Sequence, residues 1–298
     1  MRVPTNSSAE AVIAQIQKLS ARQSHLQTQL ATNQRIFLPS DDAPAAGRVL
    51  NMEHERGQLT QFTKNAGTAL EISQASFAGL KGLKNISDRA GEIATLGTGT
   101  ASPDALRAYA AEVDQLIEQT LQTGNSRFRN DYLFAGTAVD TEPFTVTRNG
   151  AGQITAAAYA GNTGQMSVPL SETTTVQPGT DSTANLGIRD MINRLVTLRD
   201  ALASGNTAAV TAARPALEQT EDVLVNSLSG HGAVELRIEI SQAQQKARLD
   251  NLEGLVSDEV DADIPETVVR LSQASTAYEA ALSSATKILQ MSLLDYLR

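Results

Sequence analysis

The 298-residue sequence contains no cysteine and no tryptophan, and only 4% of its residues are aromatic. Without cysteine, the chain can form neither a disulfide framework nor a thiolate metal site. The scarcity of aromatics, beside abundant alanine, leucine, glutamine and threonine, favours long helices packed through small side chains over a compact enzyme core. With 41% hydrophobic residues the chain can still bury a core. These features predict a mainly α-helical protein.

Positive charge is also scarce, because 24 Lys and Arg residues stand against 33 Asp and Glu residues, a formal net charge of −9. No basic cluster interrupts this acidity, which excludes nucleic acid as a partner. No apolar run is long enough to cross a bilayer, and the N-terminal residues lack the apolar stretch of a cleaved signal peptide. We therefore expect no membrane partner, and a protein that is either cytoplasmic or exported without cleavage.

Residues typical of catalysis or metal binding are sparse. His54 and Glu55 begin a zinc-protease HExxH pattern, but Gln58 occupies the position of the second histidine. The three histidines, which include His25 and His231, lie far apart in the sequence and are interpreted as solvated surface side chains. No nucleophile is accompanied by a plausible base. The sequence predicts no enzymatic activity, no cofactor and no metal.

Each end of the chain carries an amphipathic helix whose apolar residues recur in alternating steps of three and four, the pattern of a coiled coil. A stripe this narrow cannot bury a helix in a globular core, so the two ends are predicted to pair with each other and with neighbouring copies. We call these residues the terminal seam. It comprises Val12, Ile16, Leu19, Leu26 and Leu30 near one end, and Val268, Leu271, Tyr278, Leu282, Leu289 and Tyr296 near the other.

Three polar residues, Gln23, Ser275 and Ser292, interrupt the terminal seam. They are compatible with tolerated surface polarity, or with buried polar groups that fix the register of the coiled coil. Folding the terminal helices costs the conformational entropy of many residues, while few bulky apolar side chains are available to be buried in return. We therefore expect these helices to be marginally stable until other copies pack around them.

Acidic breaks separate the terminal helices from the interior of the chain. Ser40, Asp41 or Asp42 is predicted to cap a helix that starts near Pro44. At the other end, Asp263 is followed three residues later by Glu266, the spacing of a capping box.

The interior is predicted to hold helices on either side of a short β segment. We expect a helix at 43–96 and, after a loop at 97–100, a second helix that carries Leu106 to Leu121. Strands are expected between 132 and 179, with a hairpin of 144–147 and 154–159. A further helix is expected from 186 through Gly205 to 228, and another at 234–256. The expected domains are a terminal coiled coil (1–42 and 262–298), a helical bundle (43–137 and 185–261) and a β-rich insertion (138–184). The expected fold is thus a nested hairpin.

Several motifs together resemble those of the bacterial flagellin superfamily, and within it the hook-associated protein 3 branch. The motifs are the stretch 27–46, which includes Pro-Ser-Asp-Asp, the stretch Asn-Asp-Tyr-Leu-Phe-Ala-Gly-Thr at 130–137, and the ending Ser-Leu-Leu-Asp-Tyr-Leu at 292–297. Only about residues 146–181 lie outside the resemblance.

This resemblance implies a structural junction protein of the flagellum, exported by the flagellar type III apparatus without a cleaved signal. The implied partners are further copies of the chain, hook-associated protein 1, flagellin and an export chaperone, with the terminal helices forming the inner layer of a tubular assembly. Alternatives are a divergent flagellin, a cytoplasmic coiled-coil scaffold, and an enzymatic or glycan-binding role of the β segment.

Overall fold

A computed structural model describes the backbone of residues 6–99 and 101–296, and the side chains within 10–287 except at 100. The chain forms two compact units. Unit 1 comprises residues up to Gln58 together with those from Arg248 onward, and unit 2 comprises Leu59–Ala247. The division into three domains that the sequence predicts stays a prediction.

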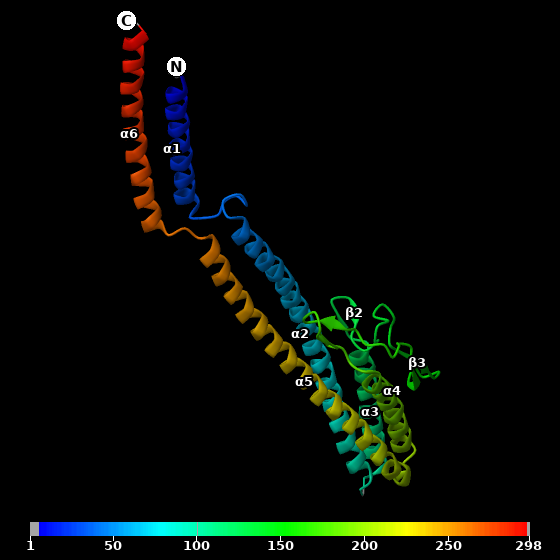
Figure 1. Cartoon of the computed structure of the whole chain (residues 1–298). Helices are drawn as coiled ribbons and strands as arrows, with labels where there is room; N and C mark the ends of the chain where they lie inside the picture. The colour runs from blue at the N-terminus through cyan, green and yellow to red at the C-terminus, as the bar shows by residue number, and fades with distance from the viewer. Residues whose placement is uncertain (1–5, 100, 297–298) are drawn as a thin grey trace. The chain divides into compact units, whose positions relative to one another are not determined.

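Unit 1 contains the terminal helices α1 (Asn6–Thr32) and α6 (Ile264–Tyr296), which lie side by side (Figure 1). It also contains the first part of α2 (Ala43–Gly97) and the last part of α5 (Thr207–Val260). Unit 2 contains the rest of these two helices, with α3 (Pro103–Gly124) and α4 (Ser182–Ala203). The predicted class, mainly α with a small β insertion, is confirmed.

The strands of unit 2 form antiparallel pairs. β1 (Arg127–Phe128) pairs with β2 (Asp131–Tyr132), β3 (Phe144–Arg148) with β4 (Ile154–Tyr159), and β5 (Val168–Pro169) with β6 (Thr175–Val176). The β3–β4 hairpin is the one predicted from its Asn149-Gly150 turn. The Asn149 side chain holds this turn by accepting hydrogen bonds from the backbone N–H groups of Ala151 and Gln153, both at 3.0 Å.

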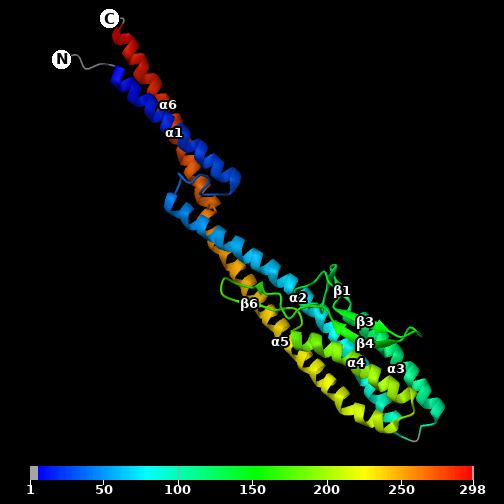
Figure 2. The ribbon, with the colours of Figure 1, turned by 90° about the vertical axis from the view of Figure 1, so that its right-hand side faces the viewer.

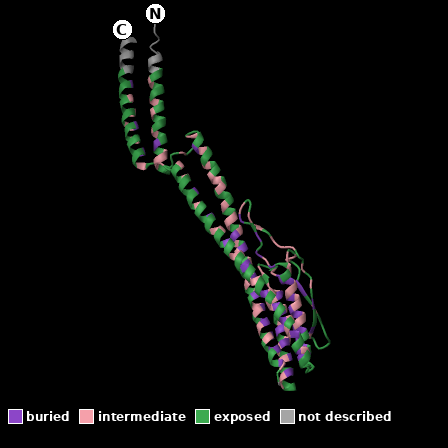
Figure 3. Ribbon diagram, turned by 60° about the horizontal axis from the view of Figure 1, so that its bottom comes forward, coloured by how far each residue is buried: buried purple, intermediate pink, exposed green. Residues whose placement is uncertain are grey.

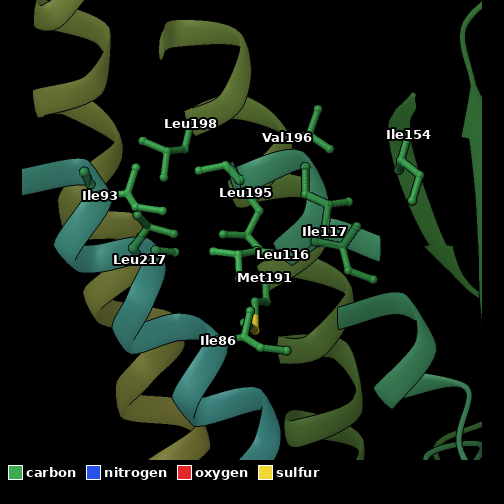
Figure 4. Packing of buried hydrophobic residues seen from close by; sticks show 14 of the residues in the cluster. Ile86, Ile93, Leu116, Ile117, Ile154, Met191, Leu195, Val196, Leu198 and Leu217 are labelled. Atoms are coloured by element: carbon green, nitrogen blue, oxygen red, sulfur yellow. The ribbon is translucent and has the colours of Figure 1, made fainter. Parts of the chain in front are cut away.

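The main hydrophobic core of unit 2 is built by α2, α3, α4 and α5 (Figure 4). Ile93 on α2, Ile117 on α3 and Leu195 on α4 are completely buried, and Leu217 of α5 is 4% exposed. Buried residues are dense in this bundle, whereas the terminal helices are mostly exposed (Figure 3). Most of the hydrophobic stabilisation of the described chain therefore lies in unit 2.

The β3–β4 hairpin belongs to this helical core and has no separate core of its own (Figure 2). Phe144 and Ile154 are both 1% exposed and pack within the main cluster. Asn125, at the end of α3, donates to the carbonyl of Phe144 and accepts from its N–H. Arg199 of α4 donates to the carbonyl of Ile154 at 2.7 Å. Two helices thus fix the hairpin by its backbone.

The β5–β6 pair packs in a second, smaller cluster with α2 and α5. Leu170 and Val176 contact Ala66, Ala69 and Ile238 there. The link is also polar, because the side chain of Gln245 donates to the carbonyl of Leu170 at 2.6 Å.

Two helix boundaries differ from the prediction. The expected helix through Gly205 is interrupted there, because Gly205 has φ +70° and Asn206 caps the next helix by accepting from the N–H of Ala209. Conversely, α5 continues through Gly230 and Gly232, where we expected a break. A helix-interior glycine costs only about 1 kcal/mol, which the packing of a long helix readily offsets.

The interpretation of His231 as a surface residue is wrong. His231 is only 5% exposed. Its Nδ1 lies 3.2 Å from Oγ of Ser73, a fully buried residue of α2. Burial lowers the pKa of His231, while the charge of Asp181 opposes this shift.

Candidate assembly site: the paired terminal helices

The N-terminal half of the terminal seam lies on the face of α1 that packs against α6. Leu26 is buried at 6% exposure, and the remaining seam residues of α1 are half-buried, as is the polar Gln23. Ile13, outside the seam, is 51% exposed. The half-buried residues are Val12, Ile16, Leu19 and Leu30.

The C-terminal half of the seam is divided between two faces of α6. Leu271 and Tyr278 are half-buried, but Val268 and Leu282 are 49% and 40% exposed. The positions buried beside Leu271 and Tyr278 are instead occupied by small or polar residues, namely Thr267, Ala274 and Ala285. Leu271 and Tyr278 of the predicted stripe therefore contribute to the pair, whereas Val268 and Leu282 are left exposed.

Some predicted residues of α6 cannot be placed in this way. The side chains of Leu289 and Tyr296, and that of Ser292, lie outside the described ones. Ser275 is half-buried, so the choice between tolerated polarity and a role in register stays open for the polar seam residues.

The two segments that connect the terminal helices to the rest of unit 1 are joined by backbone hydrogen bonds. The N–H of Arg35 donates to the carbonyl of Val260 at 2.6 Å, and the N–H of Ala262 donates to the carbonyl of Asn33 at 3.0 Å. Gln34 and Asp261 form an isolated antiparallel bridge between them. Both acidic breaks of the sequence therefore meet at one place.

The acidic residues of the breaks cap backbone N–H groups, but with distinct roles. Asp42 accepts from the N–H of Ala45 and so caps α2, and Asp263 accepts from the N–H of Glu266 at 3.0 Å and so caps α6. The Glu266 side chain accepts from Arg270 instead of closing a capping box. Ser40 is exposed on the preceding turn.

Asp41 holds this turn ahead of α2 by accepting from the N–H groups of Phe37 and Leu38, at 3.0 and 2.8 Å. The hydrogen bond from Leu38 is the main reason why the pKa of Asp41 lies below its usual value.

Arginine side chains add ion pairs across the same junction. Arg35 donates to the carboxylate of Asp42 at 3.1 Å and to the backbone carbonyl of Glu259 at 2.8 Å. Arg48 binds the Glu259 carboxylate through two nitrogens, at 2.8 and 2.9 Å, and this lowers the pKa of Glu259. No local sequence pattern marks this cluster, because Glu259 is distant in sequence from Arg35 and Arg48.

The structure gives no support to a catalytic or metal site in the part of the chain that it describes. His54 is exposed. Glu55 forms a bidentate ion pair with Arg248, whose Nε and Nη2 lie 2.7 and 3.0 Å from the carboxylate oxygens. Among the described residues, no three His, Asp or Glu side chains are grouped as metal ligands would be. None of the described helices has the length and hydropathy of a membrane span.

Comparison with known proteins confirms the resemblance found in the sequence motifs. Residues 3–139 match the bacterial flagellin N-terminal helical region. Flagellar hook-associated protein 3 of Salmonella typhimurium is 25% identical over 98% of both chains, and that of Escherichia coli is 25% identical over 89% of this chain and 90% of its own.

Solved structures share the fold. FlgL of Bacillus cereus has a TM-score of 0.60 at 17% identity, covering 70% of this chain and 99% of its own. FlgL of Xanthomonas campestris has a TM-score of 0.55 at 16% identity, covering 69% of this chain and 99% of its own.

Proposed function

We propose that this chain, which is similar to hook-associated protein 3 over nearly its whole length, is a non-enzymatic structural subunit of the bacterial flagellum. In this proposal it joins the hook-proximal hook-associated protein 1 to the flagellin filament. The observation that carries the proposal is the terminal helix pair, whose apolar seam is only partly used within one chain. Val268 and Leu282 stay exposed on α6 although they belong to the heptad pattern.

The terminal pair buries little apolar surface for its length. In the described part of α1 and α6, the buried apolar residues are Leu26, Ala274 and Ala285. The other seam residues of the pair are at best half-buried, so the pair gains little hydrophobic stabilisation for helices of this length. This limited burial supports coupled folding and assembly, in which neighbouring copies supply further contacts.

The proposal extends to export and partners. The chain would leave the cell through the flagellar type III apparatus without a cleaved signal, escorted by an export chaperone, and would form a ring or helical array with copies of itself. The terminal helices would form the inner layer, the helices of 43–137 and 185–261 a layer outside it, and residues 138–184 the outermost layer. The net charge of −9 argues against nucleic acid at any of these layers.

A deletion strain tests the proposal. Electron micrographs should show hooks without filaments, with unassembled flagellin in the medium. The wild-type gene should restore filaments, whereas Leu282→Asp should not, because the carboxylate would be buried against a neighbour in every subunit at a cost of at least about 2 kcal/mol. Gln273→Asp is the matched control, since it adds the same charge at an exposed polar position of α6 and should restore filaments.

Three results would contradict the proposal. Normal filaments in the deletion strain would exclude a junction role. A strain that lacks flagellin altogether would instead identify the chain as a divergent flagellin, the alternative that the match to the flagellin N-terminal region favours. Retention of the protein in the cell would indicate a cytoplasmic scaffold.

A further inference from the structure

The β3–β4 hairpin turns at Asn149 and Gly150, the single Asn-Gly pair of the sequence. The turn is closed by the N–H of Gly152, which donates to the carbonyl of Asn149 at 2.9 Å, and Gly152 itself has φ +85°. Asn149 and Gly150 are both exposed, so water reaches the Asn149 side chain. The turn thus combines a short amide side chain, a glycine directly after it and access for water.

Two backbone N–H groups bind the side-chain oxygen of Asn149. The nitrogens of Ala151 and Gln153 both lie 3.0 Å from Oδ1. The hydrogen bond from Ala151 closes a ring that contains both Cγ of Asn149 and the amide nitrogen of Gly150, and so folds the side chain back toward that nitrogen. Two N–H donors on one carbonyl oxygen are also the arrangement that stabilises an oxyanion in acyl transfer. Cγ of Asn149 is therefore a polarised carbonyl carbon close to a backbone nitrogen.

The backbone nitrogen of Gly150 is unobstructed. Within the part of the chain that the structure describes, its N–H donates no hydrogen bond, and a Cβ added at Gly150 would meet nothing within 4 Å. Because glycine has no side chain, the approach of this nitrogen to Cγ is open. Arg148 donates to the Gly152 carbonyl of the same turn at 2.9 Å, but Glu118 neutralises its charge. The two N–H groups on Oδ1 are therefore the groups that can stabilise negative charge there.

We propose that the native turn makes Asn149 a site of spontaneous deamidation. The amide nitrogen of Gly150 gives up its proton to hydroxide and bonds to Cγ, and the π electron pair of the side-chain carbonyl moves to Oδ1, where Ala151 and Gln153 stabilise it. When this pair returns, the bond from Cγ to Nδ2 breaks, and Nδ2 takes a proton from water and leaves as ammonia. The product is a succinimide ring, which water opens to aspartate or isoaspartate.

The two products differ in their effect on the hairpin. Aspartate keeps the backbone, can accept from the same two N–H groups and adds one negative charge. In isoaspartate the chain runs through the former side chain, so the backbone is longer by one carbon and the turn cannot close as before. Phe144 and Ile154 hold the strands in the main core, which confines the change to the tip of the hairpin. The inference needs only the folded hairpin and is independent of the proposed function.

Peptide mass spectrometry of the purified full-length protein tests this proposal. The protein is incubated at mildly alkaline pH, either native or unfolded in urea, and the conversion of each asparagine is followed with time. Asn149 should be converted about tenfold faster in the native protein, because unfolding removes both N–H donors and the folded-back side chain. Asn125 is an internal control, since the N–H of the following Ser126 is bonded to the carbonyl of Thr123 at 3.2 Å. It should be converted only after unfolding.

Gly150→Ala is the matched variant, because its Cβ has room in the native turn but hinders the approach of the nitrogen to Cγ. It should slow the native conversion of Asn149 about tenfold, with an unchanged circular dichroism spectrum. Gly179→Ala adds the same methyl group where it also meets nothing within 4 Å, and should leave the rate unchanged. The proposal is wrong if Asn149 is converted no faster in the native than in the unfolded protein, if Asn125 keeps pace with it in the native protein, or if Gly150→Ala has no effect.

Discussion

Gly124 and Gly91 offer a sharp test of the finding that the β3–β4 hairpin belongs to the helical core. Gly124 ends α3, and a Cβ added there would lie 2.8 and 3.0 Å from two ring atoms of Phe144 and 3.4 Å from Ile188. The ring is only 1% exposed, and Asn125 holds the Phe144 backbone on both sides. Phe144 therefore has little room to move away.

Gly124→Ala should lower the free energy of unfolding by about 1–3 kcal/mol, the usual cost of overpacking a core. At Gly91, inside α2, an added Cβ meets nothing within 4 Å, so Gly91→Ala should raise it by about 0.5–1 kcal/mol through helix propensity alone. Both variants add one methyl group, but they should change the free energy of unfolding in opposite directions.

Urea unfolding followed by circular dichroism at 222 nm, a wavelength that reports helix, measures both changes if the slope of the transition is unchanged. The reasoning is refuted if Gly124→Ala is as stable as Gly91→Ala, because Phe144 would then not be packed against the end of α3. A similar loss in both variants would refute the helix-propensity part instead.

Three further changes should have measurable effects. Arg199→Met should destabilise unit 2 by about 3 kcal/mol in the same urea assay, because it leaves the carboxylate of Asp114 without its buried partner. As a control, Arg107→Met removes an exposed ion pair with Asp104 and should cost under about 0.5 kcal/mol. The pKa of His231 is lowered in the native state, so its contribution to stability is present above its unfolded pKa of about 6.5 and is lost as the pH falls below that value. His231→Gln should therefore reduce the loss of the free energy of unfolding on acidification, measured by urea unfolding at several pH values. Leu26→Ala should speed hydrogen exchange in α1 by destabilising the terminal pair about 2 kcal/mol, with no change in unit 2.

Local signals predicted the features that local physics controls. Asp42 and Asp263 were identified as possible helix caps from their position, and both accept the expected backbone hydrogen bond. The Asn149-Gly150 turn located a hairpin. The periodicity also placed the start and end of α2. In each case the deciding interaction spans only a few residues, so the sequence window contains both partners.

Features that depend on distant partners were not predicted. His231 looked solvated because Ser73, its buried neighbour, is remote in sequence. The sequence marks 138–184 only as a β-rich insertion, yet Arg199 and Asn125 bind the backbone of its β3–β4 hairpin from two helices. Replacing 140–182 by a linker should therefore remove part of the bundle core and lower its stability.

The division of the α6 seam explains how one amphipathic stripe can serve two interfaces. A stripe with apolar residues in steps of three and four presents two adjacent rows, and a single partner helix can cover only one of them well. In α6 the covered positions include the small Ala274 and Ala285, while Val268 and Leu282 remain exposed. Small residues bring the two helices together at little gain in apolar burial, so the isolated pair is weak. In the proposed assembly, Val268 and Leu282 would be available for contacts with neighbouring copies, and those contacts would supply stability that the terminal pair lacks by itself.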